Sequence, residues 1–520
     1  EEAAGPPPFA DMTATSGVAF SYRNGEEAGH LAIIESLGGG VALFDYDGDG
    51  LLDIFLPGGG YYDGKRVLGH PCKLYRNLGD FKFEDVSAAV GLDRVTFPYS
   101  HGAAAFDYDR DGRPDLLVTG YNRLVLLHNE ADGRGGRRFV DATATAGLTD
   151  GLWSTSAAWG DLDGDGYPEV YVCHYGDWGF DTNHPTDCVY DGKTRDICQP
   201  RRFQPLPHTL YHNNRDGTFA DVSQRLKLRK DGRGIGVVFA DVNNDARPDI
   251  YAANDTDDNF LYMNRSAAAG LALEEVGLVA GVARDERGIA NGSMGIDVGD
   301  FDRSGRASLF VTNYEGELPA LYRNAADKGP GRFTFDTQRA GIGVIGGSYV
   351  SWGTGFFDHD NDGWEDLLIV SGHAIRFPTK SDRRQRPVLL RNRGGQFRPA
   401  VSTGWAYVGE PHNAQMIKAD KIKAWDIYKP AGMDPVTKEK SPNAVEGGKE
   451  RIERKGNVVD VYMTAIRSHF TPDIIRVKEG DKVRIHLTSL EQAHDATHGF
   501  TIDSYNINTS LEPGEHSDME

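Results

Sequence analysis

The chain has 520 residues, a formal net charge of −21 at pH 7, 39% hydrophobic residues and 26% charged residues. This length exceeds what one hydrophobic core supports, so it predicts several domains or a closed repeat architecture. The composition is near the average of globular proteins, which argues against long disorder. The acidic balance argues against a nucleic-acid partner. The sequence also lacks an apolar run of about 18 residues that could span a membrane.

The N-terminal residues Glu1 to Ala4 lead into three prolines at 6–8, and the chain does not open with Met. Such a start is typical of a mature end left after removal of a signal peptide. We therefore expect an extracytoplasmic protein, either periplasmic or secreted.

A nine-residue acidic motif recurs along the chain, in loops that start at residues 45, 107, 161, 241, 300 and 358. We call these the first to sixth loops. Five of them carry Asp, Asn or Glu at positions one, three, five and nine, and these residues are Asp45, Asp47, Asp49, Asp53, Asp107, Asp109, Asp111, Asp115, Asp161, Asp163, Asp165, Glu169, Asp241, Asn243, Asp245, Asp249, Asp358, Asp360, Asp362 and Asp366. The fifth loop has decayed, since Ser304 and Ser308 stand at positions five and nine.

Calcium is the predicted ligand of the five intact loops. Four carboxylate or amide oxygens, together with a backbone carbonyl from position seven, can surround a hard cation. Without a cation, three or four like charges would crowd each turn, and a merely solvated acidic turn is the alternative. An EF-hand would need Glu at position twelve, where the first loop has Leu56.

Apolar, β-rich segments flank the loops, such as Gly38–Phe44 before the first loop and Leu52–Leu56 after it. A second signature, Leu-x-x-Asn, follows each loop, and its copies start at Leu74, Leu126, Leu210, Leu261, Leu321 and Leu389. A turn and a further strand come next, so each unit supplies about four strands, as in one blade of a propeller. Gly and Ala before the loops fit inner strands that converge near the propeller axis.

Four cysteines are too few for a disulfide framework in a chain of this length. Cys188 and Cys198 bracket a polar insertion between the third and fourth loops. We expect a local disulfide between them, with free thiols as the alternative, and a buried Cys173 beside a strand in either case.

These repeats, together with Phe9–Phe20, resemble the FG-GAP (VCBS-type) repeats of the cartilage acidic protein family and its bacterial relatives. The resemblance covers about the first 400 residues. It implies an all-β fold, a β-propeller of about seven blades with calcium-binding loops over residues 1–428. It also implies an exported scaffold that binds a protein or carbohydrate ligand, and not an enzyme.

The acidic repeats stop after about Val401, and the charged stretch 429–456, with its Pro and Gly residues, predicts an exposed linker. Apolar alternation then predicts strands that would form the first half of a small β-sandwich over 457–520, at Val458–Met463, Ile474–Val477, Lys482–Leu487 and Gly499–Ile502. Half a sandwich would leave an unpaired edge, which allows a homo-oligomer or a redox partner.

The tail resembles nitrous oxide reductase at the junction between its propeller and its copper A cupredoxin domain, through Gly409–His412, Val477–Asp481 and Thr497–Thr501. The resemblance implies that residues 405–428 complete the last blade and that 457–520 form a partial cupredoxin-like domain. It further implies that His412 is a ligand of the catalytic copper cluster and His498 a ligand of copper A, and imidazole is a normal copper ligand.

Two departures favour structural roles for these histidines as the alternative. The bridging cysteines of copper A are missing, because all four cysteines lie in the repeats, and the inner strands offer only His101 for a catalytic copper cluster. A natural fusion, a truncated chain and a composite chain would all give this sequence. The alternative function is therefore copper-dependent electron transfer, or reduction of nitrous oxide to dinitrogen.

Overall fold

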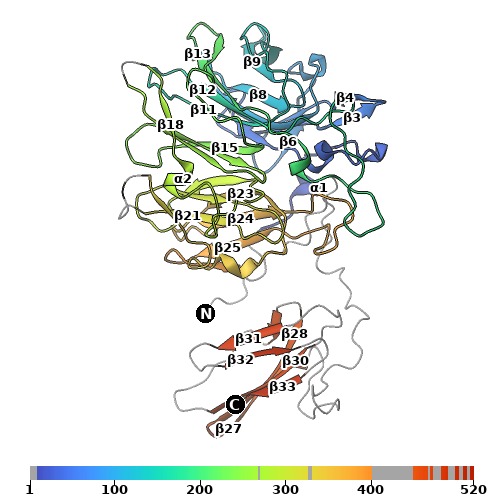
Figure 1. Cartoon of the computed structure of the whole chain (residues 1–520), viewed down its shortest axis with the longest axis vertical. Helices are drawn as coiled ribbons and strands as arrows, with labels where there is room; N and C mark the ends of the chain where they lie inside the picture. Colours follow the sequence, from blue (N-terminus) through green and yellow to red (C-terminus); the bar gives the residue numbers. More distant parts are fainter. Residues whose placement is uncertain are drawn as a thin grey trace. The chain divides into compact units, whose positions relative to one another are not determined.

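The computed structural model describes residues 9–267, 270–325, 329, 331–400, 449–466, 469–471, 482–489, 498–502, 507–511 and 516–519. The chain divides into two compact units, Glu1–Ala419 and Asp420–Glu520 (Figure 1). The described α-helices are two single turns, α1 (Thr13–Ser16) and α2 (Gly277–Ala280), and the 3-10 turns are η1 (Glu26–Ala28), η2 (Ile33–Ser36), η3 (Leu92–Arg94), η4 (Pro200–Arg202) and η6 (Ile342–Ile345). None of the described helices has the length and apolarity that crossing a membrane requires.

Six antiparallel four-stranded sheets follow one another in the first unit. The first three sheets contain β1 (Ala42–Phe44), β2 (Asp53–Leu56), β5 (Lys73–Asn77) and β6 (Phe83–Asp85); β7 (Ser100–Phe106), β8 (Asp115–Gly120), β9 (Val125–Ala131) and β10 (Arg137–Asp141); and β11 (Ser154–Gly160), β12 (Glu169–His174), β13 (Thr209–Asn213) and β14 (Phe219–Asp221). The other three contain β15 (Gly234–Ala240), β16 (Asp249–Asn254), β17 (Phe260–Asn264) and β18 (Leu273–Glu275); β19 (Ile296–Gly299), β20 (Ser308–Val311), β21 (Ala320–Asn324) and β22 (Phe333–Phe335); and β23 (Ser351–Phe357), β24 (Asp366–Ser371), β25 (Val388–Asn392) and β26 (Phe397–Pro399). A hairpin, β3 (Gly60–Asp63) and β4 (Arg66–Gly69), extends from the first sheet.

The sheets are arranged like the blades of a propeller. Their first strands, β1, β7, β11, β15, β19 and β23, pack against one another in chain order. The predicted unit of four strands is therefore confirmed, and six such units occupy residues 42–399. The residues assigned to a last blade, 405–428, lie outside the described part of the chain, so the expectation of about seven blades stays a prediction.

The sequence of each sheet explains its place in the core. Every residue of the second strands β8, β12 and β16 is buried, as expected for short, continuous apolar runs covered on both faces. Inner strands come too close for larger side chains at some positions: a Cβ on Gly236 would lie 2.7 Å from the Met294 carbonyl oxygen, and one on Gly295 would lie 1.8 Å from that of Trp352.

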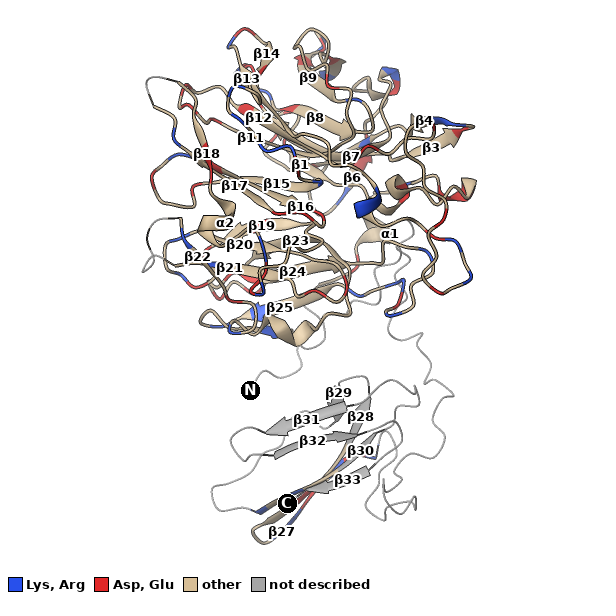
Figure 2. Ribbon diagram, viewed as in Figure 1, with Lys and Arg blue, Asp and Glu red and all other residues tan. Residues whose placement is uncertain are grey.

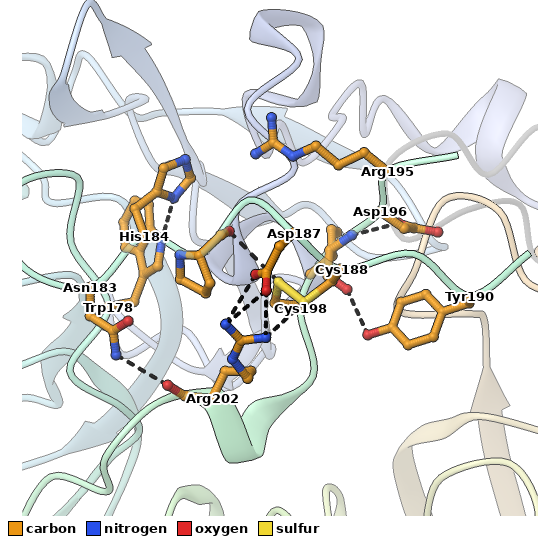
Figure 3. The surroundings of a disulfide bond; sticks show 12 residues. Trp178, Asn183, His184, Asp187, Cys188, Tyr190, Arg195, Asp196, Cys198 and Arg202 are labelled. Carbon is orange, nitrogen blue, oxygen red and sulfur yellow. Dashed lines mark hydrogen bonds and ion pairs between the residues drawn. A yellow bond between two sulfur atoms is a disulfide. The ribbon is translucent and has the colours of Figure 1, made fainter. Parts of the chain in front are cut away.

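A disulfide-closed insertion lies between β12 and β13. Cys188 and Cys198 are bonded to each other, as predicted (Figure 3). Cys173 is a buried free cysteine in β12. Two carboxylate oxygens of Asp196 accept the backbone N–H groups of Arg376 (2.9 Å) and Phe377 (2.7 Å), which follow β24. The insertion is thereby tied to the sixth repeat as well as to its own.

The second unit contains a five-stranded sheet of β27 (Arg451–Lys455), β28 (Val458–Ile466), β29 (His469–Thr471), β30 (Lys482–Ser489) and β33 (His516–Met519), and a hairpin of β31 (His498–Ile502) and β32 (Ile507–Leu511). β28 and β30 are parallel, and the other pairs are antiparallel. Three of the four predicted strands are confirmed, and Ile474–Val477 lies outside the described residues. β27 lies inside the stretch 429–456 expected to be a linker. Its residues form a strand because they pair with β28 across a tight turn at Gly456.

Candidate cation-binding loops

All six acidic loops lie at one end of the sheets, because each loop joins the first strand of a sheet to the second. The inner strands run in the same direction: the Thr155 hydroxyl near the start of β11 donates to the Gly234 carbonyl at the start of β15 (2.7 Å), and Gly160 at the end of β11 lies against Phe239 near the end of β15. Many of the charged side chains of the unit lie on its loops, while most residues within the strands are uncharged (Figure 2).

Backbone N–H groups hold the first and last acidic side chains of the five intact loops. In the first loop, Asp45 accepts hydrogen bonds from the N–H groups of Gly48 (2.8 Å), Asp49 (3.1 Å) and Gly50 (2.8 Å). Asp53, at position nine, accepts from Tyr46 (3.0 Å) and Asn77 (2.7 Å). These bonds orient the carboxylates and offset part of the like-charge repulsion that the sequence alone predicts for an ion-free turn.

The third residue of each Leu-x-x-Asn signature faces the loop of its own sheet. Leu116 of β8 pairs with Leu127 of β9, which places Asp115 of the second loop across from His128. The same register recurs in the other sheets, and the residues that face the loops are Arg76, His128, His212, Met263, Arg323 and Arg391. Sequence reasoning missed these six residues, although their constant offset from the signature asparagine was a usable signal.

In three of the six loops the residue at this register position is an arginine that pairs with acidic side chains of the loop. In the first loop Arg76 lies 2.7 Å from Asp47 and 3.1 Å from Asp49. Arg391 pairs in the same way with Asp360 and Asp362 of the sixth loop. In the decayed fifth loop, Arg323 contacts Asp302 at 2.7 Å.

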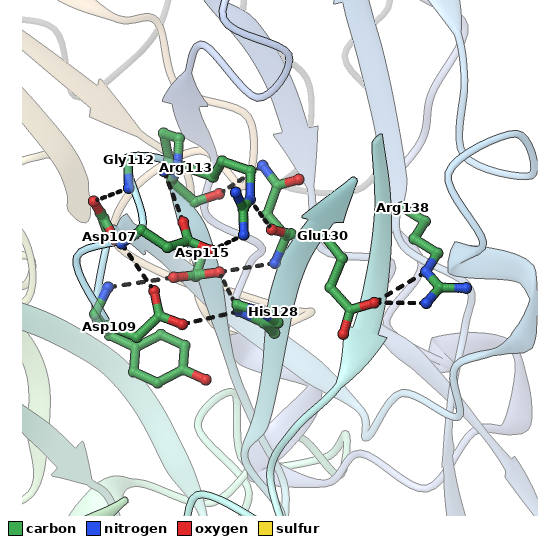
Figure 4. Close-up of polar contacts among 12 residues, drawn as sticks. Asp107, Asp109, Gly112, Arg113, Asp115, His128, Glu130 and Arg138 are labelled. Atoms are coloured by element: carbon green, nitrogen blue, oxygen red, sulfur yellow. Dashed lines mark hydrogen bonds and ion pairs between the residues drawn. The ribbon is translucent and has the colours of Figure 1, made fainter. Parts of the chain in front are cut away.

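An imidazole takes this place in the second loop, which Figure 4 shows, and in the third loop. His128 Nδ1 lies 3.1 Å from Asp115 Oδ1 and 3.6 Å from Asp109 Oδ2. His212 Nδ1 lies 2.8 Å from Glu169 Oε1 and 3.9 Å from Asp163 Oδ2. Burial raises the pKa of Asp115 and of Glu169 to about 7 each, and the hydrogen bonds that they accept from backbone N–H groups oppose this shift.

The fourth loop has no ionisable side chain across from its ninth position, because Met263 stands there. Burial raises the pKa of its ninth residue, Asp249, to about 6. At position three, the amide oxygen of Asn243 is buried and lacks a hydrogen-bond partner among the described residues, while the Nδ2 group of Asn243 contacts the Met263 sulfur at 3.6 Å. An oxygen buried in this way is costly unless a donor or a cation meets it.

The predicted residues come together in part. Ligand atoms lie within 4.8 Å of one another in sets drawn from four loops: Asp45, Asp47 and Asp53; Asp109, Asp115 and His128; Asp163, Glu169 and His212; and His359, Asp360 and Asp366. The carboxylates at position five pair with arginines, namely Asp49 with Arg76, Asp111 with Arg113, Asp165 with Arg215, Asp245 with Arg247 and Asp362 with Arg391. In all five intact loops the position-five carboxylate therefore forms an ion pair with an arginine.

Three histidines are candidate copper ligands: His412, His498 and His101. His412 lies outside the described residues, and His498 is the first residue of β31. His101, in inner strand β7, is buried, its Nε2 accepts a hydrogen bond from the indole of Trp153 at 3.0 Å, and burial lowers its pKa to about 3. His101 is therefore a neutral, hydrogen-bonded side chain of the core.

A buried acid lies at the end of the sheets opposite the loops. The Tyr175 hydroxyl, just after β12, donates to Asp255 Oδ2, just after β16, at 2.5 Å. Burial raises the pKa of Asp255 to about 7, and the bond from Tyr175 acts in the opposite direction. No motif in the sequence points to this pair, whose members are 80 residues apart.

Comparison with known proteins agrees with the repeat pattern. The family described as FG-GAP-like repeat matches residues 45–118, 107–172 and 207–252. The chain is 23% identical over 287 residues to cartilage acidic protein 1 of Xenopus tropicalis. This alignment covers 53% of this chain and 40% of that protein.

Two further likenesses were found. The chain is 30% identical over 113 residues to the nitrous-oxide reductase of Stutzerimonas stutzeri, which covers 21% of this chain and 18% of the reductase. The chain thus matches less than half the length of either curated relative. A solved lectin from Agrocybe aegerita, described as specific for non-reducing terminal N-acetylglucosamine, is 15% identical to this chain. The two structures align with a TM-score of 0.39 over 69% of this chain and 78% of the lectin, and a score this low supports no argument.

Proposed function

We propose that the first unit is a calcium-binding scaffold, a β-propeller that is exported and that presents its loops to a protein or carbohydrate ligand. The observation that carries the calcium proposal is the convergence of oxygen donors in the loops. In the first loop, ligand oxygens of Asp45, Asp47 and Asp53 lie within 4.8 Å of one another. Calcium prefers carboxylate, amide and carbonyl oxygens, so the residues present fit this ion.

The fourth loop supports the proposal independently. Its donors would be Asp241, Asn243, Asp245 and Asp249, and the amide oxygen of Asn243 is buried without a donor among the described residues. A cation bound by this oxygen would compensate its burial and the negative charge around it. The chain's own contribution is to hold the side chains in place through backbone N–H groups, as Asp241 is held by those of Asp245 (3.0 Å) and Ala246 (2.7 Å).

Export is supported by the Cys188–Cys198 disulfide, because structural disulfides persist in oxidising compartments and are rare in the cytosol. The described acidic side chains at the loops are engaged with backbone N–H groups, arginines and histidines, and we assign no catalytic residue to them.

The test is thermal unfolding of the full chain with 1 mM calcium and with excess chelator. If a site binds with a Kd of about 10 μM, calcium at 100 times this value stabilises the folded state by about 2.7 kcal/mol per site. The variant D241N/D249N should lose part of this calcium response, whereas N214A, in an exposed turn, should keep all of it. An unchanged melting temperature on chelation in the unaltered protein would refute calcium binding.

The second candidate function belongs to the second unit and rests on the partial identity to nitrous-oxide reductase. We propose a copper-binding, cupredoxin-like segment that takes part in electron transfer, with His498 and His412 as candidate ligands. Copper analysis of the full chain after loading, with H498A and H412A as comparisons, tests this function. Absence of bound copper, or copper that both variants retain in full, would refute it.

A further inference from the structure

We propose that the second and third loops form two sites for a divalent transition metal of the zinc class, each with one imidazole ligand, while the other intact loops remain oxygen-only sites. The inference rests on the proposed cation binding by the loops and concerns which metal each loop selects. Imidazole suits zinc and its neighbours, whereas calcium takes oxygen ligands.

The geometry of the second loop fits such a site. Asp109, Asp115 and His128 bring two carboxylate oxygens and an Nδ1 atom together, with 3.1 Å and 3.6 Å between Nδ1 and the two carboxylates (Figure 4). Ligands of one zinc ion bind at about 2.0–2.2 Å, so they lie at most about 4.4 Å apart. Both Nδ1 distances are within this limit.

The third loop repeats the arrangement with a longer acid. Glu169 replaces Asp at position nine, and His212 Nδ1 lies 2.8 Å from Glu169 and 3.9 Å from Asp163. Both loops therefore bring two carboxylates and one imidazole together. A cluster of this composition is not an acidic turn with an incidental neighbour.

Backbone groups fix the ligand that lies deepest in each site. Asp115 accepts N–H groups of Asn129 (2.8 Å) and Tyr108 (3.3 Å), and its side chain is fully buried. Glu169 accepts the N–H of Leu162 at 2.8 Å. Such outer contacts orient the ligands of a metal site and reduce the reorganisation that binding requires.

The other loops show why the preference is confined to these two. Arg76, Arg323 and Arg391 stand at the register position of the histidines in the first, fifth and sixth loops, and a guanidinium cannot ligate a metal. Met263 of the fourth loop offers no nitrogen. His359 of the sixth loop contacts Asp366, but Arg391 already pairs with the neighbouring Asp360.

The test measures zinc bound per chain in the full-length protein and in H128N/H212N. Asparagine keeps a polar group near the carboxylates and removes the imidazole, so the variant should bind about two fewer zinc ions and keep its calcium response. The matched control H359N should bind as much zinc as the unaltered chain. Cobalt, used as a spectroscopic substitute, should show visible absorption that is lost in H128N/H212N and kept in H359N.

A gain-of-function variant guards against misfolding of the double variant. M263H places an imidazole beside the ninth residue of the fourth loop and should add about one zinc ion per chain. Equal zinc content in the unaltered protein and H128N/H212N, or no gain in M263H, would overturn the inference. If neither calcium nor zinc raises the melting temperature, cation binding itself fails; if calcium alone does so, only the zinc preference fails.

Discussion

Asn264 donates its side-chain amide to the backbone carbonyl of Leu162, at 2.8 Å, although Leu162 lies 102 residues earlier in the chain and in the preceding sheet's loop. The same bond recurs between Asn129 and Tyr46, Asn213 and Tyr108, Asn324 and Val242, and Asn392 and Phe301. Each acceptor is position two of the preceding acidic loop. The signature asparagine thus fixes a sheet to the loop of its neighbour.

Replacing Asn264 should therefore lower the free energy of unfolding of the first unit by more than the small size of this side chain suggests. In N264A the buried carbonyl of Leu162 and the partly buried carbonyl of Pro248 lose their donor, and an unsatisfied buried polar group costs about 1–3 kcal/mol. N77A is the matched variant, because Asn77 donates its amide to Leu52 of its own sheet. Chemical denaturation should show a larger loss of unfolding free energy for N264A, and equal losses would contradict the role of the bond between sheets.

Removing Arg76 should increase the affinity of the first loop for calcium. The guanidinium contacts Asp47 and Asp49, two of the side chains that we predict to bind the cation, so R76M frees them and removes a positive charge. We expect about tenfold tighter binding, which corresponds to about 1.4 kcal/mol. In chelator the loss of these partly exposed ion pairs should cost less than about 1 kcal/mol.

Calcium titration followed by melting temperature measures this change. R138M, which breaks the exposed pair of Arg138 with Glu130 away from the loop ligands, is the control and should leave the calcium response as it is. A weaker calcium response in R76M would show that the guanidinium supports the site and does not compete for it.

The buried Asp255 should make the stability of the first unit fall as the pH rises. Its folded pKa of about 7 lies above the unfolded value of about 3.9, so the folded state holds the proton more tightly. The stabilisation is present below pH 4 and is lost as the pH rises through 7, by up to about 4 kcal/mol.

Unfolding free energies of the unaltered chain and D255N, measured in chelator from pH 4 to pH 8, test this prediction. The difference between the two proteins should change across this range, because D255N lacks the titrating group. D216N, in an exposed turn, should follow the unaltered chain. A constant difference between the unaltered chain and D255N would exclude a raised pKa for Asp255.

Loss of the disulfide should destabilise the insertion between β12 and β13. Cys188 and Cys198 are 10 residues apart, and closing a loop of that length constrains the unfolded chain by about 2–3 kcal/mol. C188A/C198A should therefore unfold at lower denaturant than the unaltered chain under oxidising conditions. Reducing agent should lower the stability of the unaltered chain only, and an effect of similar size on the variant would assign the change to another cause.

Much of the first unit could be predicted because its information is local. The acidic positions of each loop are close in sequence, apolar strands flank them, and the Leu-x-x-Asn signature marks the third strand of every sheet. The Cys188–Cys198 pair was accessible for the same reason. These features require no knowledge of which strands pair.

The contacts that give each loop its character depend on pairing between strands, which the sequence does not display. His128 meets Asp115 only because Leu116 pairs with Leu127, and a shift of one residue would turn the imidazole to the other face of the sheet. The pair of Tyr175 and Asp255 joins different sheets and has no local pattern at all. The number of blades and the role of residues 405–428 remain predictions.

The closed insertion also determines how the chain would respond to a protease. Lys193 is exposed and lies between Cys188 and Cys198, inside the ring that the disulfide closes. A cut after Lys193 would leave the two fragments covalently joined, and Asp196 would still hold the backbone of Arg376. Tryptic clipping at this point should leave the mass of the chain intact on a non-reducing gel and reveal two fragments only after reduction.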